Sequence, residues 1–405
     1  MTNCLSSEFF HGPEKVHQVR TLGVVSVARS DYGIYHPLLR KIVVDRELKL
    51  QLYVAGSHLA QEFGLTVGEI ERDGFPIFRR LETLLGADSP EAIAKSIGVG
   101  VSRFAEAFAT ERPDLLVVLG DRFDMYPACV AAVPYKLPVA HIHGGELTFG
   151  AIDDALRHSM TKLSHLHFAS TDEYARRIRQ MGEEPWRITV SGALSLDNLA
   201  SFTPLSTAEI EKRWSLQLGS PFLLATYHPV TLEPEHTVFQ VREFLTALDT
   251  VGLPTVITFP NADTNGRAVI QILKDFAGTH PQIQLVQNLG IHGYFSLMKL
   301  ASAMVGNSSS GILEAASFKL PVVNIGSRQE GRSRGKNVID CGYSSENIGA
   351  AIRKALSNEF RQGLRELQNP YQGPQPAADL ILERLKSVSL DEKLIQKRFV
   401  DLPAA

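Results

Sequence analysis

Short apolar runs recur along the chain and alternate with stretches of helical periodicity. The runs span residues 22–28, 49–56, 115–120, 139–145, 165–170 and 188–193 in the first half, and 222–228, 255–261, 283–287, 303–309, 321–326 and 337–342 in the second. Near-continuous apolar runs are typical of parallel strands buried on both faces. Because strands that alternate with helices form βαβ units, the pattern predicts an α/β protein with doubly wound parallel sheets.

The chain is long enough for two domains. Its 405 residues exceed the roughly 250–300 at which a single hydrophobic core stops growing. A Ser/Thr/Pro-rich stretch at 201–206 is typical of a linker and leads into a new amphipathic helix. We therefore predict an N-terminal domain of residues 1–200 and a C-terminal domain of residues 201–405, whose last helix could pack back on the first domain.

Composition narrows the class of protein. Hydrophobic residues make up 44% and charged residues 21% of the chain, as in ordinary soluble proteins. A formal net charge of -3 gives no electrostatic case for binding nucleic acid or an anionic membrane. Neither a signal peptide nor an apolar run of about 20 residues is present. Three widely spaced cysteines fit a reducing compartment, so we expect a cytoplasmic protein.

Polar residues follow two of the expected strands at their carboxyl ends, where doubly wound sheets bind ligands. Arg29 follows the first strand, and its guanidinium could form a bidentate hydrogen bond to a phosphate. Asp121 and Arg122 follow the strand at 115–120, and the carboxylate could act as an acid or base in a cleft. Capping of the next helix is the competing interpretation of both segments.

The densest polar cluster begins at residue 141. His141 and His143 lie two apart in an expected strand, so they would share one face of the sheet. Gly144 and Gly145 would let the backbone approach a ligand closely. Glu146 follows them directly and adds a carboxylate to the cluster.

Asp153 and Asp154 open the next expected helix. Arg157 and His158 stand four residues after them, so surface ion pairs compete with a catalytic interpretation. The histidines and carboxylates could also ligate a metal, but their spacing matches no compact zinc motif. Acid–base chemistry accounts for the same residues, and we predict neither a metal nor a cofactor.

The second half carries a candidate pyrophosphate cradle. A strand ends at Gly306, and Ser308 and Ser309 precede a helix expected to begin near Gly311. Serine hydroxyls and free N–H groups at a helix N-terminus suit a pyrophosphate. Glu314 could bind ribose hydroxyls, and a serine-rich cap beside a surface glutamate is the alternative.

Other polar residues of the second half also follow strands. His228 ends one strand, Asn261 and Asp263 lie in the loop after another, and Arg328 lies in a basic loop after a third. A phosphate-facing loop and a solvated basic loop are both consistent with that composition.

In order, the segments ARSDYG, LGDR, HIHGGE, IDDALRH, HPVT, PNAD, GNSSSGILEA and NIGSRQEGR resemble those of hydrolysing UDP-N-acetylglucosamine 2-epimerases, from about residue 23 to about residue 334. These are bacterial sialic-acid-pathway enzymes and the epimerase half of an animal bifunctional enzyme. The resemblance implies the GT-B fold, in which two Rossmann-like domains enclose the active site between them. It also implies a homodimer or homotetramer.

The resemblance further implies a reaction, the first step of sialic acid biosynthesis. UDP would leave UDP-N-acetylglucosamine together with the C2 proton to give a 2-acetamidoglucal, and water would then add to give N-acetylmannosamine. Removing the C2 proton calls for a positioned base, and expelling UDP calls for cations at its phosphates.

Residues are assigned by matching the motifs position by position. The catalytic candidates are Asp121, His143, Glu146, Asp153 and His228, the last of which also matches a nucleotide-binding position. The candidates for binding nucleotide or substrate are Arg29, Arg122, Asn261, Asp263, Ser308, Ser309, Glu314 and Arg328.

One position departs from the family pattern. Many relatives read HIEGGE where this chain reads HIHGGE, so His143 stands in place of a glutamate. The third acid–base role then falls to His143 or Glu146, and an imidazole is a credible substitute because histidines transfer protons at neutral pH.

Three alternatives stay open. One is the same reaction on a UDP- or GDP-linked 2,4-diacetamido-2,4,6-trideoxyhexose, on the way to legionaminic acid. The second is a GT-B glycosyltransferase, which would need no such set of carboxylates. The third is a non-catalytic nucleotide-sugar-binding protein, and the joint presence of Asp121, Glu146, Asp153 and His228 argues against it.

Overall fold

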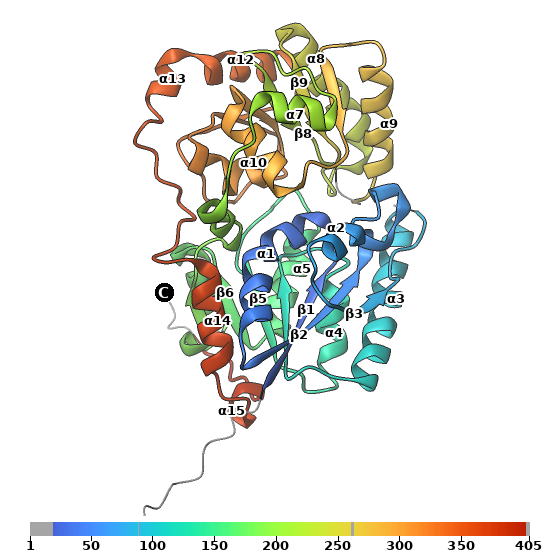
Figure 1. Cartoon of the computed structure of the whole chain (residues 1–405), viewed down its shortest axis with the longest axis vertical. Helices are drawn as coiled ribbons and strands as arrows, with labels where there is room; N and C mark the ends of the chain where they lie inside the picture. The colour runs from blue at the N-terminus through green and yellow to red at the C-terminus, as the bar shows by residue number, and fades with distance from the viewer. Residues whose placement is uncertain (1–18, 88, 261–262, 402–405) are drawn as a thin grey trace, which may run out of the picture.

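The computed structural model describes residues 19–87, 89–260 and 263–401. These residues form two α/β halves arranged one above the other along the long axis of the molecule (Figure 1). One half contains a seven-stranded sheet and the other a six-stranded sheet. All the strand pairs in both sheets are parallel. The predicted fold class, two doubly wound domains of the GT-B type, is confirmed.

The sheet of the first half has the strand order β3-β2-β1-β4-β5-β6-β7. Its strands are β1 (Arg20–Ser26), β2 (Leu48–Ala55), β3 (Ile77–Leu81), β4 (Leu115–Leu119), β5 (Val139–Ile142), β6 (Leu166–Ala169) and β7 (Ile188–Val190). Its helices are α1 (Arg29–Val44), α2 (Val67–Arg72), α3 (Pro90–Thr110), α4 (Tyr126–Ala132), α5 (Asp153–Leu163) and α6 (Asp172–Gln180).

The sheet of the second half has the order β10-β9-β8-β11-β12-β13. Its strands are β8 (Leu223–Thr226), β9 (Thr255–Thr258), β10 (Ile283–Val286), β11 (Ala303–Gly306), β12 (Val322–Ile325) and β13 (Val338–Cys341). The remaining helices are α7 (Thr207–Trp214), α8 (Thr237–Val251), α9 (Gly266–Ala277), α10 (Gly290–Leu300), α11 (Ser310–Leu313), α12 (Ser345–Leu356), α13 (Asn358–Gln362), α14 (Ala377–Ser387) and α15 (Glu392–Ile395).

The strand order places the candidate site. In each sheet the direction of winding reverses once, between β1 and β4 in the first half and between β8 and β11 in the second. Ligands of open α/β sheets bind outside the carboxyl ends of the strands at this switch point. Central strands such as β4 are buried along their whole length, so only the residues beyond their carboxyl ends are free to carry chemistry.

The pattern of apolar runs misses one strand. The edge strand β3 reads IFRRL, and Arg79 and Arg80 interrupt the apolar pattern there. Charged side chains are tolerated at this place because an edge strand is only partly covered, and they also discourage pairing with another chain. The other strands fall within or overlap the predicted runs.

The last two helices lie against the first half (Figure 1). α14 packs on α1, and the N–H groups of Ala377 and Ala378 at its start donate to the Asp197 carboxylate at 2.9 and 2.6 Å. Arg187 donates a hydrogen bond to the carbonyl of Leu394, a residue of α15, at 2.8 Å. Within the described ranges, none of the helices combines the length and apolarity needed to cross a lipid bilayer.

Candidate functional site

The candidate residues come together where the two halves meet, beyond the strand ends. Arg29 follows β1, Asp121 and Arg122 follow β4, and His143 follows β5. From the second half, His228, Asp263, Ser308 and Arg328 follow β8, β9, β11 and β12, in that order. Asn261 lies outside the described residues.

Arg122 and Arg328 share one carboxylate across the two halves. Nε of Arg122 donates to Asp124 at 3.0 Å, and its Nη1 donates to Asp263 at 3.4 Å. Nη2 of Arg328 lies 3.8 Å from the other carboxylate oxygen of Asp263. Two guanidinium groups are thus held together, as neutralising a diphosphate requires. The sequence analysis did not identify Asp124. Its only signal in the sequence is its position in the segment GDRFD, which follows β4.

Arg157 of α5 is fully buried, and its guanidinium donates hydrogen bonds to four groups. It donates to Asp121, to Asp154 at 3.1 Å, to Thr148 Oγ1 at 3.0 Å and to the Glu146 carbonyl at 2.9 Å. The spacing-based pairing of Arg157 with Asp153 is therefore wrong, because the guanidinium points inward to Asp121. The pairing of Asp154 with His158 is present at 3.5 Å.

Asp121 and Asp153 have pKa values displaced in opposite directions. Burial raises the pKa of Asp121, but the charges of Arg157 and Arg332 outweigh it and hold this pKa below its usual value. Burial raises the pKa of Asp153 to about 7, and the neighbouring Asp121 and Asp263 add to the effect. Environments that separate two pKa values in this way assign different proton-transfer roles to the two groups.

His143 does not lie in the strand with His141, so the prediction of a shared sheet face is wrong. β5 ends at Ile142, and His143 has a left-handed φ of 66°. His141 is buried, with its ring nitrogens 2.7 Å from the Gly120 carbonyl and 3.2 Å from Thr161 Oγ1. The turn after the strand thus separates a structural histidine from one that faces the second half.

Gly144 and Gly145 lie close against neighbouring protein atoms. A Cβ on Gly145, whose φ is 78°, would lie 2.5 Å from the Tyr174 carbonyl oxygen. A Cβ on Gly144 would lie 3.0 Å from the ring of His141. Packing against these neighbours accounts for a glycine at both positions, and approach of this backbone to a ligand stays a prediction.

His143 and Glu146 form a buried pair. Nδ1 of His143 lies 2.6 Å from Oε1 of Glu146, which also accepts a hydrogen bond from Ser170 at 2.8 Å. Arg332 of the second half approaches the other oxygen at 3.1 Å. Although burial raises the pKa of Glu146, Arg332 and His143 together bring it well below its usual value. This carboxylate therefore stays ionised.

His228 follows β8 in the second half and is buried. Its N–H donates to the Asn307 side chain at 2.7 Å, and the Asn307 amide donates back to its carbonyl at 2.8 Å. Burial, followed by the charges of Arg328, Arg122 and Arg29, lowers the pKa of His228 well below the ordinary value. The imidazole is therefore neutral at physiological pH.

The serine-rich loop forms less helix than expected. α11 comprises only Ser310–Leu313, preceded by Ser308 and Ser309. Glu314 at its end is buried, and its Oε2 has no hydrogen-bond partner in the described part of the chain. Burial raises the pKa of Glu314 to about 7. A buried oxygen of this kind is available to a ligand hydroxyl.

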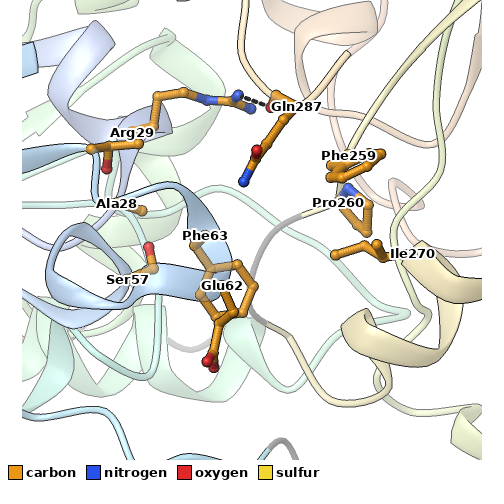
Figure 2. Close-up of a pocket in the computed structure, with 10 residues that line it drawn as sticks. Ala28, Arg29, Ser57, Glu62, Phe63, Phe259, Pro260, Ile270 and Gln287 are labelled. Atoms are coloured by element: carbon orange, nitrogen blue, oxygen red, sulfur yellow. Dashed lines mark hydrogen bonds between the residues drawn. The ribbon is translucent and has the colours of Figure 1, made fainter. Parts of the chain in front are cut away.

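Arg29 spans the junction at a pocket between the halves (Figure 2). Its Nη1 donates to the Gln287 carbonyl at 2.6 Å, whereas Asp31 closes the strand-to-helix turn by accepting from Val27 and Ala28 at 2.8 and 2.6 Å. The pocket is lined by Ala28, Arg29, Ser57, Glu62, Phe63, Thr66, Phe259, Pro260, Ile270 and Gln287. Among the residues described, no group of three or more His, Cys, Asp or Glu is placed to hold a metal ion.

Known proteins resemble this chain over nearly its whole length. The family model described as UDP-N-acetylglucosamine 2-epimerase matches residues 40–386. The GDP/UDP-N,N'-diacetylbacillosamine 2-epimerase (hydrolyzing) of Campylobacter jejuni is 39% identical over 385 residues, which cover 95% of this chain and 99% of that one. The UDP-N,N'-diacetylbacillosamine 2-epimerase (hydrolyzing) of Legionella pneumophila is 32% identical, over 94% of this chain and 99% of that one.

Two further similarities bear on the sugar and on the fold. A UDP-N-acetylglucosamine 2-epimerase of Neisseria meningitidis serogroup B is 30% identical over 93% of this chain and 98% of its own length. The crystal structure of a UDP-GlcNAc 2-epimerase from Neisseria meningitidis bound to UDP-GlcNAc superposes with a TM-score of 0.76 at 19% identity, over 90% of this chain and 99% of that one.

Proposed function

The chain belongs to the UDP-N-acetylglucosamine 2-epimerase family, and we propose that it is a hydrolysing 2-epimerase acting on a nucleotide-linked 2,4-diacetamido-2,4,6-trideoxyhexose. One observation carries the reaction type. Asp121 and Asp153, whose pKa values are displaced in opposite directions, lie beside an arginine pair contributed by both halves. Proton transfer at carbon and expulsion of a diphosphate need these two kinds of group side by side.

The choice of sugar rests on the relatives. Two full-length relatives, at 39% and 32% identity, are named as hydrolysing epimerases of diacetylbacillosamine. The sequence-based choice of UDP-N-acetylglucosamine becomes the second candidate, and the 30% identical Neisseria relative favours it.

The first step of the proposed reaction is an elimination. Asp153, as the carboxylate, takes the proton from C2, and the electron pair of that C–H bond forms the C1=C2 double bond. The bond from C1 to the nucleoside diphosphate breaks, and its electrons leave on the phosphate oxygen. Arg122 and Arg328 offset the negative charge that develops there. A carboxylate whose pKa lies near 7 is a stronger base than an ordinary aspartate.

The second step is a hydration. Water adds its oxygen to C1 and loses a proton, while C2 gains a proton on the face opposite to the one it lost. The reaction therefore needs proton-transfer groups on both sides of the sugar. Asp121 is poorly suited to donate a proton because Arg157 and Arg332 keep it ionised.

A small cleft beside Asp153 has both apolar and polar lining residues. Ile93, Phe123 and Ile152 form an apolar wall there, and Thr231 and Asp263 add polar atoms. An acetamido group combines a methyl group with an amide, so it can use both kinds of surface. A diacetamido sugar carries two groups of this kind.

Proton NMR in deuterated water tests the proposal. The full chain is incubated in parallel with UDP- and GDP-linked diacetylbacillosamine and with UDP-N-acetylglucosamine. We expect free diacetamido-trideoxymannose deuterated at C2, with release of the nucleoside diphosphate. Turnover of UDP-N-acetylglucosamine alone would establish the second candidate, and nucleotide release without deuterium at C2 would refute an epimerase of either kind.

A further inference from the structure

His143 has one ring nitrogen paired and one left open. The residue is 5% exposed, and its Nδ1 lies 2.6 Å from Oε1 of Glu146. Its Nε2 is buried and has no hydrogen-bond partner among the described residues. Burying an unpaired polar nitrogen costs free energy, so such an atom calls for an explanation, and a ligand that completes the bond is one.

The backbone of His143 adopts a strained conformation, which sets the direction of its ring. A φ of 66° is uncommon for a residue with a Cβ, and such strain concentrates at functional sites. The conformation is held by the His143 N–H, which donates to the Phe168 carbonyl at 2.9 Å, and by the close packing of Gly145 on Tyr174. A relaxed continuation of β5 would keep the ring beside His141 instead.

The surroundings of Glu146 decide which nitrogen of His143 carries the proton. Glu146 is ionised, accepts hydrogen bonds from Ser170 and His143, and forms an ion pair with Arg332. An ionised carboxylate can only accept, so Nδ1 of His143 bears the hydrogen. In the neutral form of the ring, which a proton-accepting role requires, Nε2 therefore presents its lone pair.

The charges that face the pair come from several elements. Arg332 and Glu314 approach from the second half, where Glu314 interacts electrostatically with His143. Arg157 of α5 lies on the first-half side and interacts with Glu146. His143 therefore stands at the junction of the halves, where the proposed substrate binds.

His167 makes a useful contrast. It also pairs with a buried glutamate, Glu183, at 3.0 Å, and its Nδ1 has no hydrogen-bond partner in the part of the chain that the structure describes. It lies inside β6, however, and its charged neighbours besides Glu183 are Lys397 and Arg187. A buried histidine–glutamate pair alone is therefore not enough for a catalytic role, and the position of His143 facing the second half is what distinguishes it.

We propose that Nε2 of His143 is a proton-transfer atom of this site and that Glu146 is the positioning residue that fixes its tautomer. This inference rests on the proposed function. In the hydration step, the Nε2 lone pair takes a proton from the attacking water, and the electron pair of the broken O–H bond stays on the oxygen that bonds to C1. The Glu146 carboxylate offsets the charge of the imidazolium, which gives this proton up to solvent after the product has formed.

Two half-reactions test the catalytic role in the full chain. Elimination is followed by nucleotide release from UDP-diacetylbacillosamine, and hydration is followed from the corresponding glycal. His143→Gln should lower the rate of hydration by about 100-fold or more, within the range for general acid–base groups, with KM within about threefold. Glu146→Gln should give a smaller loss of kcat, and Glu146→Asp should restore part of it. The matched control His167→Gln, another buried member of a histidine–glutamate pair, should keep both rates within about threefold of wild type.

An outcome in which His143→Gln leaves the hydration rate within threefold of wild type would overturn the proposal. A second measurement needs no substrate: nitrogen NMR of the histidine-labelled chain reports which ring nitrogen is protonated. We expect Nδ1 of His143 to be protonated in wild type and the single tautomer to be lost in Glu146→Gln. Protonation at Nε2 in wild type would also overturn the proposal. Because this measurement is independent of the sugar, failure of the inference is distinguishable from failure of the proposed function.

Discussion

Arg122 and Asp263 form an ion pair across the two halves, with Nη1 of the arginine 3.4 Å from Oδ1 of the aspartate. Both side chains are buried, and they stand 141 residues apart in the chain. Arg328 shares the same carboxylate at 3.8 Å. If the two guanidinium groups bind the diphosphate as proposed, it would compete with Asp263 for them, and we expect nucleotide binding to depend on the relative position of the halves.

Arg122→Lys should weaken nucleotide binding. Lysine keeps the charge but loses the planar fork that matches phosphate oxygens. A hydrogen bond to a charged group contributes about 1.5–3 kcal/mol, so we expect the Kd for UDP to rise about tenfold or more. Isothermal titration calorimetry measures this, with Arg103→Lys, an exposed arginine on α3, as the control. An unchanged Kd would show that Arg122 does not contact the phosphates.

Asp153→Asn should lower kcat by about 100-fold or more while leaving the Kd for UDP within about threefold, since the carboxylate acts in proton transfer. Its pKa, raised to about 7 by burial, also predicts a pH profile. A base must be deprotonated to act, so kcat of the wild type should rise between pH 6 and pH 8 with a midpoint near 7. A flat profile over that range would rule out Asp153 as the base.

The same substitution should stabilise the fold at alkaline pH. Because the folded-state pKa of Asp153 lies above the ordinary aspartate value near 4, ionisation disfavours the folded state. The stability is therefore fully present below about pH 4 and is lost as the pH rises to about 7. Asp153→Asn should raise Tm relative to wild type at pH 8 and leave it unchanged at pH 4. Equal Tm differences at both values would contradict this account.

Arg157→Leu should destabilise the first half strongly. The guanidinium is buried and holds Asp121, Asp154 and the Glu146 carbonyl. Removing one partner of a buried ion pair leaves the others uncompensated, at a cost of about 3–5 kcal/mol. Urea denaturation measures the change in the free energy of unfolding. The exposed Arg103→Leu should change it by less than about 1 kcal/mol.

Glu314→Gln should weaken the binding of UDP but not that of 2′,3′-dideoxy-UDP. The buried Oε2 of Glu314 has no partner among the described residues, so a ribose hydroxyl can donate to it. The variant should lose about tenfold in affinity for UDP. Equal losses for both nucleotides would show that Glu314 supports the loop rather than the ribose.

The order of elements was readable from local pattern. Strands such as β4 are buried on both faces, and their apolar runs therefore stand out in the sequence. β3 was not predicted from the apolar pattern, because an edge strand tolerates charged residues such as Arg79 and Arg80. The positions of Asp121, Arg122 and His228 beyond strand ends followed from the same runs, since a doubly wound sheet leaves those ends open to ligand.

The contacts of the site were decided by the tertiary structure. Spacing suggested that Arg157 pairs with Asp153, yet Arg157 turns inward to Asp121, which lies 36 residues away. Periodicity suggested that His143 continues a strand, yet the turn packed on α6 ends that strand at Ile142.

The sequence by itself determined which residues are apolar, where strands end and which polar groups stand beyond them, because burial in a parallel sheet imposes a local pattern. Only the tertiary structure decided that Arg122 meets Asp263, that Glu146 meets Arg332 and that Nε2 of His143 has no partner within the described ranges. A charged side chain selects its partner among groups that distant loops bring within a few ångströms. Its energy depends on burial and on those neighbours, and neither is encoded in the spacing of residues along one segment.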